Sequence, residues 1–541
     1  MDAPASLLPA PGPLLRPGDT CWRAPRARRA AVILDNARYF ALAKQAIAQA
    51  ERQVIVLGWA FDPRTRLDPR RAAPGEPDTI GAVLNAAIAR NPDLDVRLHI
   101  WDMVWPISVT RDLFPQRAAL WLDPRIRLKL ADDLPFGACH HQKLLVVDDA
   151  LAFVSGDDFA PDRWDTRAHR GVNRLRAAST GEAHPPHHGV TLMLDADAAA
   201  SLGDLARRRW AEATGETAPA PPPPRRDPWP ASVAPDLTEI RAGISRAAPG
   251  HRDRPAVREG ERLALAAIRS ARRLIYLENQ YLAAPAIGEA LAARLAEPDG
   301  PEIVAVLSPH SPSYFDRMVM DSARDALVAH LTAVDRHGRF RAYAPHAPDG
   351  RATIVHAKVM LVDDRLVRIG SANLNNRSLG FDTELDVAIE AEPGLSAEAT
   401  RAAIDALADR LPAHFLGVDP AALRAARLAH GGLIPAIEAL DRGRRLCRLA
   451  PRGAGPLGAL TAAHHLGDPP APDDAWRPWK RRAGPARLSA GHWLALGALG
   501  ALAGWGLARA LRSEPRRRSD RPISEIADRC HPGRRTATRD P

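Results

Sequence analysis

Two segments of the chain carry a histidine, a lysine and an aspartate at the same spacing, H-x-K-x-x-x-x-D. The first holds His141, Lys143 and Asp148, and the second, 215 positions later, holds His356, Lys358 and Asp363. Histidine serves as nucleophile, general acid or general base because its pKa lies near neutrality. A lysine ammonium is a compact positive charge that suits phosphate oxygens. Together these residue types predict phosphoryl transfer.

Lysine is rare in this sequence, which makes its presence in both motifs informative. Only five of the 74 basic residues are lysines, and two of the five are Lys143 and Lys358. Solvated strand ends would accept arginine, the common cation here, so we interpret these lysines as parts of a site. A lysine as the second side chain also opposes the binding of a metal cation. We therefore expect phosphate chemistry with no metal ion and no other cofactor.

The elements around each motif predict how these side chains are positioned. Residues i and i+2 of a strand face the same side, so we expect the histidine and lysine of each copy to project together from an apolar strand, with the aspartate at its turn. Helical patterns alternate with apolar strands on both sides of a proline-rich stretch at 214–235. The sequence therefore predicts an α/β fold of two similar α-β-α lobes, related by a pseudo-twofold duplication, each with a mixed sheet flanked by helices.

Composition divides the chain further. Prolines exclude helices and central strands from 214–235, and an arginine-rich tail without apolar periodicity follows residue 508. We expect an N-terminal extension (1–30), a first lobe (31–213), a linker (214–235), a second lobe (236–418), a helical or linker region (419–487), a hydrophobic helix (488–508) and a basic disordered tail (509–541).

Further segments resemble one known family. The second motif is followed by GSANLNNRS from Gly370, and RLIYLENQYL begins at Arg273. With the two H-x-K-x-x-x-x-D motifs, and with the early ILDNARYF and VLGWAFD stretches, they resemble the phospholipase D superfamily over roughly Val32 to Gly417. After the first motif the chain departs from the family pattern: Asp158 matches, but the acidic Asp157 leaves the headgroup contacts open.

The resemblance implies roles for the motif residues. His141 is expected to attack phosphorus and His356 to act as general acid, although the symmetric pattern also permits the reverse. The lysines, with Asn373 and Ser371, are expected to hold the non-bridging oxygens, and the two aspartates to orient the site. The predicted substrate-binding residues are Asp158, Glu278, Asn279, Gln280, Ser371, Asn373 and Glu384.

Charge distribution argues for a lipid rather than a nucleic acid. The net charge is +10, but residues 471–541 carry 15 Lys/Arg and 7 Asp/Glu, which is +8 of that total. A duplex-binding protein usually carries its basic face on the folded body, and here the body is nearly neutral. The four cysteines are far apart and indicate reduced thiols, and the proline-broken N-terminus does not indicate a signal peptide.

The apolar run at 488–508 contains no Asp, Glu, Lys or Arg. It is about as long as a bilayer core requires, so we predict a single-pass anchor in the inner membrane, with a buried hairpin or a peripheral helix as alternatives. The rest of the chain is expected in the cytoplasm. Basic residues flank both ends of the run, which leaves its orientation open.

The leading functional prediction is a monomeric, membrane-associated phospholipase D that hydrolyses the headgroup-side phosphodiester of glycerophospholipids to phosphatidic acid. A transphosphatidylase of the cardiolipin-synthase kind would use the same residues with an alcohol acceptor. A nuclease of the same superfamily is disfavoured by the neutral body and by two motifs in one chain. A membrane-tethered scaffold with relict motifs is disfavoured because all six motif residues are intact.

Overall fold

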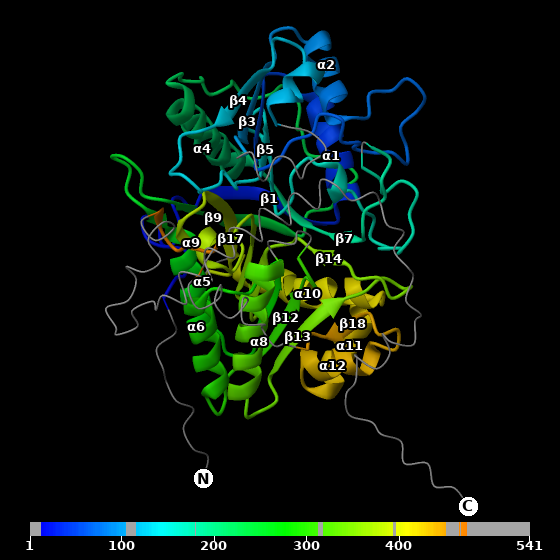
Figure 1. Ribbon diagram of the computed structural model, residues 1–541, viewed down its shortest axis with the longest axis vertical. Coiled ribbons are helices and arrows are strands. Elements are labelled where there is room, and N and C mark those ends of the chain that lie inside the picture. Colours follow the sequence, from blue (N-terminus) through cyan, green and yellow to red (C-terminus); the bar gives the residue numbers. More distant parts are fainter. Residues whose placement is uncertain are drawn as a thin grey trace, which may run out of the picture.

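Continuous apolar runs form the central strands, because helices cover both faces of the sheet and leave no water-facing side. β2 (Gln53–Gly58), β5 (Leu144–Val147), β11 (Leu274–Asn279) and β15 (Val359–Val362) are buried along their whole length. The computed structural model describes residues 12–103, 115–178, 180–311, 317–392, 396–450, 465 and 467–472. Within them the chain has a mixed α/β architecture built on a large sheet (Figure 1).

Two antiparallel strands join the sheet in its middle. β1 (Arg26–Leu34) pairs with β9 (Leu237–Ala248), and Figure 1 shows them lying between the N-terminal and C-terminal parts of the molecule. Outward from β1 the sheet continues through β8 (Val190–Asp195), β6 (Leu151–Ser155), β5, β2, β3 (Asp95–Trp101) and β4 (Arg127–Ala131). Outward from β9 it continues through β17 (Glu384–Glu390), β16 (Leu366–Gly370), β15, β11, β12 (Glu302–Leu307), β13 (Phe340–Pro345) and β18 (Leu446–Arg448).

The strands from β1 to β4 form what is here called the first side of the sheet, and those from β9 to β18 form the second side. The two sides share one pairing pattern. β2 is parallel to β3 and antiparallel to β5, while β11 is parallel to β12 and antiparallel to β15. Each motif strand then forms a hairpin with the next strand, β5 with β6 and β15 with β16. Away from the sheet, the short β7 (His187–His188) and β14 (Ile354–Val355) form a parallel pair that links the two sides.

Helices form the outer layers. The apolar faces of α1 (Asn36–Gln49) and α2 (Ile80–Arg90) pack on the first side of the sheet. Those of α5 (Glu259–Ser270), α6 (Pro285–Ala296) and α8 (Ser322–Val334) pack on the second. The opposite face is covered by α4 (Ala196–Thr214), α10 (Ala397–Leu416), α11 (Pro420–His430) and α12 (Leu433–Leu440). The short α9 (Asn376–Gly380) follows the second motif hairpin.

The segments outside the two expected lobes also carry structure. The N-terminal extension is anchored, since Leu14 and Leu15 are buried and donate their backbone N–H groups to Glu390. The region after 418 is not only helical, because β18 adds a strand at the edge of the sheet. The run at 488–508 and the tail at 509–541 lie outside the described residues. In the described part of the chain, no helix combines the length and apolar character needed to cross a bilayer.

The two motif aspartates stabilise the ends of neighbouring strands. The carboxylate of Asp148 accepts hydrogen bonds of 2.7–2.8 Å from the backbone N–H groups of residues 51–53, where β2 begins. Asp363 accepts bonds of 2.7–2.9 Å from residues 272–274, where β11 begins. Both aspartates have positive φ angles, 54° and 53°. A short acidic side chain that tolerates this turn and caps three donors explains why aspartate stands there.

We predict that Asp363→Ala lowers the free energy of unfolding by about 2 kcal/mol, because three strand-end donors lose a charged acceptor. Urea denaturation followed by circular dichroism measures the change. The matched control is Asp364→Ala, whose carboxylate makes only a surface ion pair with Arg273 at 2.9 Å and should cost less than about 1 kcal/mol. Equal losses in the two variants would contradict the capping role.

Candidate active site

Each motif histidine and lysine lies just before its strand rather than on it. β5 begins at Leu144 and β15 at Val359, one residue after the lysine in each case. The preceding segments are still tied down: the His141 N–H donates to the carbonyl of Thr383 at 3.0 Å and that of His356 to the carbonyl of His188 at 2.8 Å. The motif histidines and lysines, which we expected on strands, therefore lie in the segments that lead into β5 and β15. These segments are held by backbone hydrogen bonds to the other side of the sheet.

His141 is oriented by a carboxylate from the second side of the sheet. Its Nδ1 lies 2.9 Å from both Oε1 and Oε2 of Glu384, the first residue of β17. Ser371 donates its hydroxyl hydrogen to the same carboxylate. Glu384 is fully buried, whereas the His141 side chain is 15% exposed. In its ionised form Glu384 holds the proton on Nδ1 and leaves the Nε2 lone pair available for reaction. Burial raises the pKa of this carboxyl group well above its ordinary value, so nearby positive charge is needed to keep it ionised.

His356 has the reciprocal arrangement, with a carboxylate from the first side. Its Nδ1 lies 2.9 Å from Oδ1 of Asp157, and the histidine side chain is 7% exposed. The same aspartate oxygen lies 2.8 Å from Nε2 of His187. Although burial opposes ionisation, His187 and His356 hold the pKa of Asp157 well below its ordinary value. Asp157 therefore acts as the charged partner that orients His356.

The position of Asp157 differs from that of Glu384, and the sheet register explains how. Gly370 of β16 pairs with Asp386 of β17, and Ser155 of β6 pairs with Thr191 of β8. Two residues before Asp386 stands Glu384, but two residues before Thr191 stands Gly189. A Cβ atom at Gly189 would lie 2.0 Å from Oδ2 of Asp157. The Asp157 side chain thus fills the space that the missing side chain leaves, and supplies the carboxylate from a neighbouring strand end.

The two lysines flank these histidines. Nζ of Lys143 lies 3.3 Å from Oδ2 of Asp158, whose Oδ1 accepts the backbone N–H of Trp59 at 2.7 Å. Nζ of Lys358 lies 3.0 Å from Nδ1 of His356 and 3.5 Å from Oε1 of Gln280. Both lysines are at most 3% exposed. Two buried ammonium groups beside two imidazoles favour an anion between them.

Burial sets the protonation states at the site. It lowers the pKa of His141 well below its ordinary value, with Lys143 and Lys358 adding repulsion. It lowers the pKa of His356 in the same way, with Lys358 as the largest charge contribution. The pKa of Lys358 itself falls to about 7, because burial and the charge of Lys143 outweigh the attraction of Asp157. The free site therefore holds neutral imidazoles, whose lone pairs are not blocked by protonation.

The other predicted residues divide between the site and its supports. Asn373 is buried and its Oδ1 has no hydrogen-bond partner among the described residues. Asn279 accepts the backbone N–H groups of Tyr281 and Leu374 and so braces the loop. Glu278 is directed elsewhere, to Nε2 of His188 at 2.9 Å. Asp148 and Asp363 lie at the far ends of β5 and β15, so the structure separates them from the histidines.

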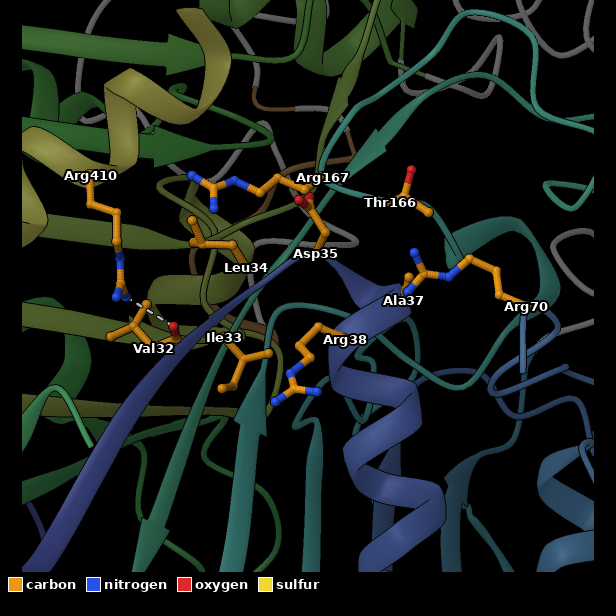
Figure 2. Close-up of a pocket in the computed structure, with 10 residues that line it drawn as sticks. All are labelled: Val32, Ile33, Leu34, Asp35, Ala37, Arg38, Arg70, Thr166, Arg167 and Arg410. Atoms are coloured by element: carbon orange, nitrogen blue, oxygen red, sulfur yellow. Dashed lines mark hydrogen bonds between the residues drawn. The ribbon is translucent and has the colours of Figure 1, made fainter. Parts of the chain in front are cut away.

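Apolar residues lie close to the polar site. Trp59 stacks on Trp101 with ring centroids 5.6 Å apart, and its ring lies 6.5 Å edge-on from that of His141. On the other side, Tyr281 packs with Val319 and Met320, and its hydroxyl accepts a hydrogen bond from Gln280. A separate pocket, lined by Val32–Asp35 and by Arg38, Arg70, Arg167 and Arg410, contains neither motif (Figure 2).

Two features of the site could not be found by motif spacing. Asp157 stands where we expected a disturbed headgroup contact, and it proves to be the partner of His356. Four buried residues close to Glu278, namely Asp35, His169, His188 and His414, gather from distant parts of the chain. The adjacent pair His187-His188 was the available sequence signal, but nothing in its spacing names the partners.

The chain is similar to several known proteins. The family model described as cardiolipin synthase, PLD-like domain matches residues 264–405, which include the second motif. Phospholipase D2 of Bos taurus is 26% identical over 153 residues, 28% of this chain and 16% of that protein. Phospholipase D alpha 3 of Arabidopsis thaliana is 21% identical over 480 residues, 63% of this chain and 58% of that protein. The crystal structure of phosphatidylserine synthase from Haemophilus influenzae Rd KW20 aligns with a TM-score of 0.49 and 14% identity, over 77% of this chain and 96% of that one.

With its two motifs, its matching family model and its phospholipase D relatives, the chain belongs to the phospholipase D superfamily, as the motifs predicted. More narrowly, the region around its second motif is similar to the PLD-like domain of cardiolipin synthases. The chain spans less than two thirds of the length of either phospholipase. The superfamily includes phospholipid-modifying enzymes.

We predict that Asp157→Ala lowers the rate of phosphodiester cleavage by roughly 100-fold, because His356 loses the carboxylate that fixes its tautomer. Adding Gly189→Asp to that variant should restore part of the rate, since the freed space then receives a carboxylate from the position equivalent to Glu384. Turnover of bis(p-nitrophenyl) phosphate measures both effects.

The single variant Gly189→Asp is the matched control. Alone it places a side chain against the Asp157 carboxylate, so it should reduce both stability and rate. A double variant that is no faster than Asp157→Ala would contradict the idea that a carboxylate at position 189 can replace the one at position 157.

Proposed function

We propose that the chain is a phospholipase D, which cleaves the distal phosphodiester of a glycerophospholipid in two steps through a phosphohistidine. The observation that carries this proposal is the reciprocal pairing of His141 with Glu384 and of His356 with Asp157. Each carboxylate sits at Nδ1 and leaves Nε2 free, as an attacking group and a proton donor both require.

In the first step, Nε2 of His141 attacks phosphorus and forms a P–N bond. The bond from phosphorus to the headgroup oxygen breaks, and that oxygen takes a proton from Nε2 of His356. The greater exposure of His141, 15% against 7% for His356, supports its assignment as the nucleophile. Splitting one displacement into two is the usual gain of nucleophilic catalysis.

In the second step, His356 takes a proton from water or from an alcohol, whose oxygen attacks phosphorus and displaces His141. The low pKa of His356 in the free site suits this basic role. The negative charge of a bound phosphodiester favours its protonated form for the first step. Lys143 and Lys358 offset the charge that develops on the non-bridging oxygens, with Asn373 as a further hydrogen-bond donor.

An amphipathic diester fits the surroundings of these groups better than a polyanion. The apolar walls at Trp59 and Trp101 and at Tyr281 and Met320 would contact glycerol and acyl atoms. The basic charge of the chain is concentrated after residue 470, away from the residues that form the site. A phospholipid at a membrane surface is therefore the proposed substrate.

A second candidate is transfer of the phosphatidyl group to an alcohol, as in cardiolipin synthesis. The observation that favours it is the description of the matching family model at residues 264–405. The same histidines would perform both reactions, and the acceptor that reaches His356 decides between them.

The two sides of the sheet are proposed to derive from one duplicated unit. The matching register supports this, since Ser155 donates its N–H to the Lys143 carbonyl at 3.2 Å and Gly370 donates to the Lys358 carbonyl at 3.2 Å. The shared order of the strands around each motif supports it as well.

The full chain, incubated with phosphatidylcholine or phosphatidylethanolamine vesicles and ethanol without added metal, is expected to form phosphatidylethanol and phosphatidic acid. Mass spectrometry of the lipid products measures the ratio. His141→Ala and His356→Ala should each lose roughly 1,000-fold or more in rate. Phosphatidylglycerol as the sole lipid tests the second candidate, because cardiolipin would then be the main product.

His330→Ala serves as the control, since this histidine lies on the exposed side of α8. Unchanged turnover in either motif variant would refute the mechanism. Cleavage of single-stranded DNA with no lipid turnover would replace the lipid substrate with a nucleic acid.

We predict that kcat/KM falls above about pH 7, because the phosphate-binding ammonium of Lys358 has a pKa of about 7 in the free site and loses its charge there. Lys358→Arg should be slower, but its falling limb should move to higher pH since a guanidinium stays protonated. Lys143→Arg is the matched control and should keep the original limb. A limb that stays at the same pH in Lys358→Arg would assign it to another group.

A further inference from the structure

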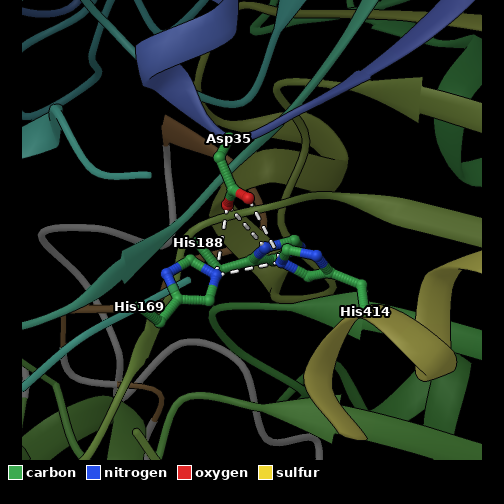
Figure 3. Close-up of side chains that lie close together, drawn as sticks. All are labelled: Asp35, His169, His188 and His414. Atoms are coloured by element: carbon green, nitrogen blue, oxygen red, sulfur yellow. Dashed lines mark hydrogen bonds and ion pairs between the residues drawn. The ribbon is translucent and has the colours of Figure 1, made fainter. Parts of the chain in front are cut away.

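A cluster of four buried side chains lies beside the active site and belongs to neither motif (Figure 3). Asp35 connects β1 to α1, His169 lies in the loop before β7, His188 is in β7, and His414 is in the last turn of α10. None is more than 4% exposed. Three come from the first side of the sheet and one from a helix near the C-terminal end, so the cluster joins distant parts of the chain.

The ligand atoms of this cluster are spaced as around a single metal ion. Oδ1 of Asp35 lies 3.2 Å from Nε2 of His169 and 3.0 Å from Nδ1 of His188. Oδ2 lies 3.2 Å from Nε2 of His414, and the two Nε2 atoms lie 3.0 Å apart. All four ligand atoms lie within 4.8 Å of one another. Ligands at about 2.0–2.1 Å from Zn²⁺ in a tetrahedron would be about 3.3 Å apart, close to these spacings.

Two of the histidines are held from behind as metal ligands usually are. Nδ1 of His169 lies 3.1 Å from Oδ2 of Asp165, and Nε2 of His188 lies 2.9 Å from Oε2 of Glu278. A carboxylate on the far nitrogen directs the other nitrogen and its lone pair toward the centre of the cluster. This accounts for Glu278, which the sequence placed in the substrate pocket.

If the three imidazoles are neutral, the charged groups around the cluster carry two more negative than positive charges. Three carboxylates, those of Asp35, Asp165 and Glu278, face three imidazoles. The guanidinium of Arg176 lies 3.1 Å from Asp165 and offsets one of them. A divalent cation bound by neutral imidazoles would neutralise the remainder. Protonated imidazoles are the alternative to the ion: although burial opposes it, Glu278 and Asp35 raise the pKa of His188 to about 10, and Asp35 and Asp165 raise the pKa of His169.

Two further observations support a missing partner at the centre. Oδ2 of Asp35 is buried and, apart from its contact of 3.2 Å with Nε2 of His414, has no hydrogen-bond partner among the described residues. The backbone of Asp35 has a φ angle of 66°, where a non-glycine residue is strained. Such strain persists when the surrounding structure demands it, and clusters at ligand sites. Asp35 also lines part of the pocket shown in Figure 2.

We propose that Asp35, His169, His188 and His414 form a structural Zn²⁺ site with three nitrogen ligands and one oxygen ligand. Four protein ligands close the coordination sphere, so the ion takes no part in phosphoryl transfer. Its role is positional. The carbonyl of His188 accepts the backbone N–H of His356 at 2.8 Å, so fixing His188 also fixes the second motif. The lysines that disfavour a cation at the motifs are not part of this cluster.

The test uses the untagged full chain, produced with zinc in the medium and analysed by inductively coupled plasma mass spectrometry after dialysis. About one zinc per chain is expected. His414→Asn and Asp35→Asn should each bring the ratio to near zero and lower the melting temperature. The control His99→Asn replaces another buried histidine, outside the cluster, and should retain the metal.

A second measurement does not depend on variants that fold. The wild-type chain, stripped with a strong chelator and titrated with Co²⁺, should show the visible absorption of four-coordinate cobalt, which Zn²⁺ then displaces. A wild-type chain that holds no zinc and gives no cobalt band would overturn the proposal, as would full zinc retention in His414→Asn. In either case the cluster is a hydrogen-bonded network of charged imidazoles. Lipid turnover is not the readout, so the result is independent of the proposed function.

Discussion

Each motif histidine is held by a carboxylate from the opposite side of the sheet, and the site depends on that exchange. Glu384 orients His141 and Asp157 orients His356, both at 2.9 Å. Because each pair crosses between the two sides, neither side alone contains a motif histidine together with the carboxylate that orients it. The antiparallel pairing of β1 with β9 and the bridge between β7 and β14 keep the two sides in the register that these short contacts require.

The exchange is not symmetric in its details. Glu384 belongs to β17 and meets its histidine directly, whereas the equivalent position on the first side is Gly189. Asp157 reaches the same place from the end of β6, and the glycine leaves room for it. Both motif histidines therefore have a carboxyl group at Nδ1, but the residue that supplies it stands at a different position on each side.

Low exposure gives these contacts their strength and also their cost. Buried ammonium groups at Lys143 and Lys358 lower the pKa values of nearby histidines, and burial makes the charge of Lys358 itself marginal near pH 7. The phosphodiester of the proposed substrate would offset this cost, because its negative charge would replace the solvent that the lysines lost. On the far side of His188, the cluster around Asp35 gathers carboxylates and imidazoles, whose charges either protonated imidazoles or the proposed divalent cation would balance.

The sequence by itself determined the family, the two motifs and the alternation of helices and apolar strands, because those properties reside in residue type and short spacing. The motif lysines were informative since lysine is rare here, whereas Asp148 and Asp363, expected to orient the site, cap the strand ends at residues 51–53 and 272–274. Only the tertiary structure decided the partners. Asp157 became a histidine partner, and Glu278 turned to His188 rather than to the pocket. Contacts between residues separated by 90 positions or more depend on strand register and packing, and no local pattern encodes which carboxylate will meet which histidine.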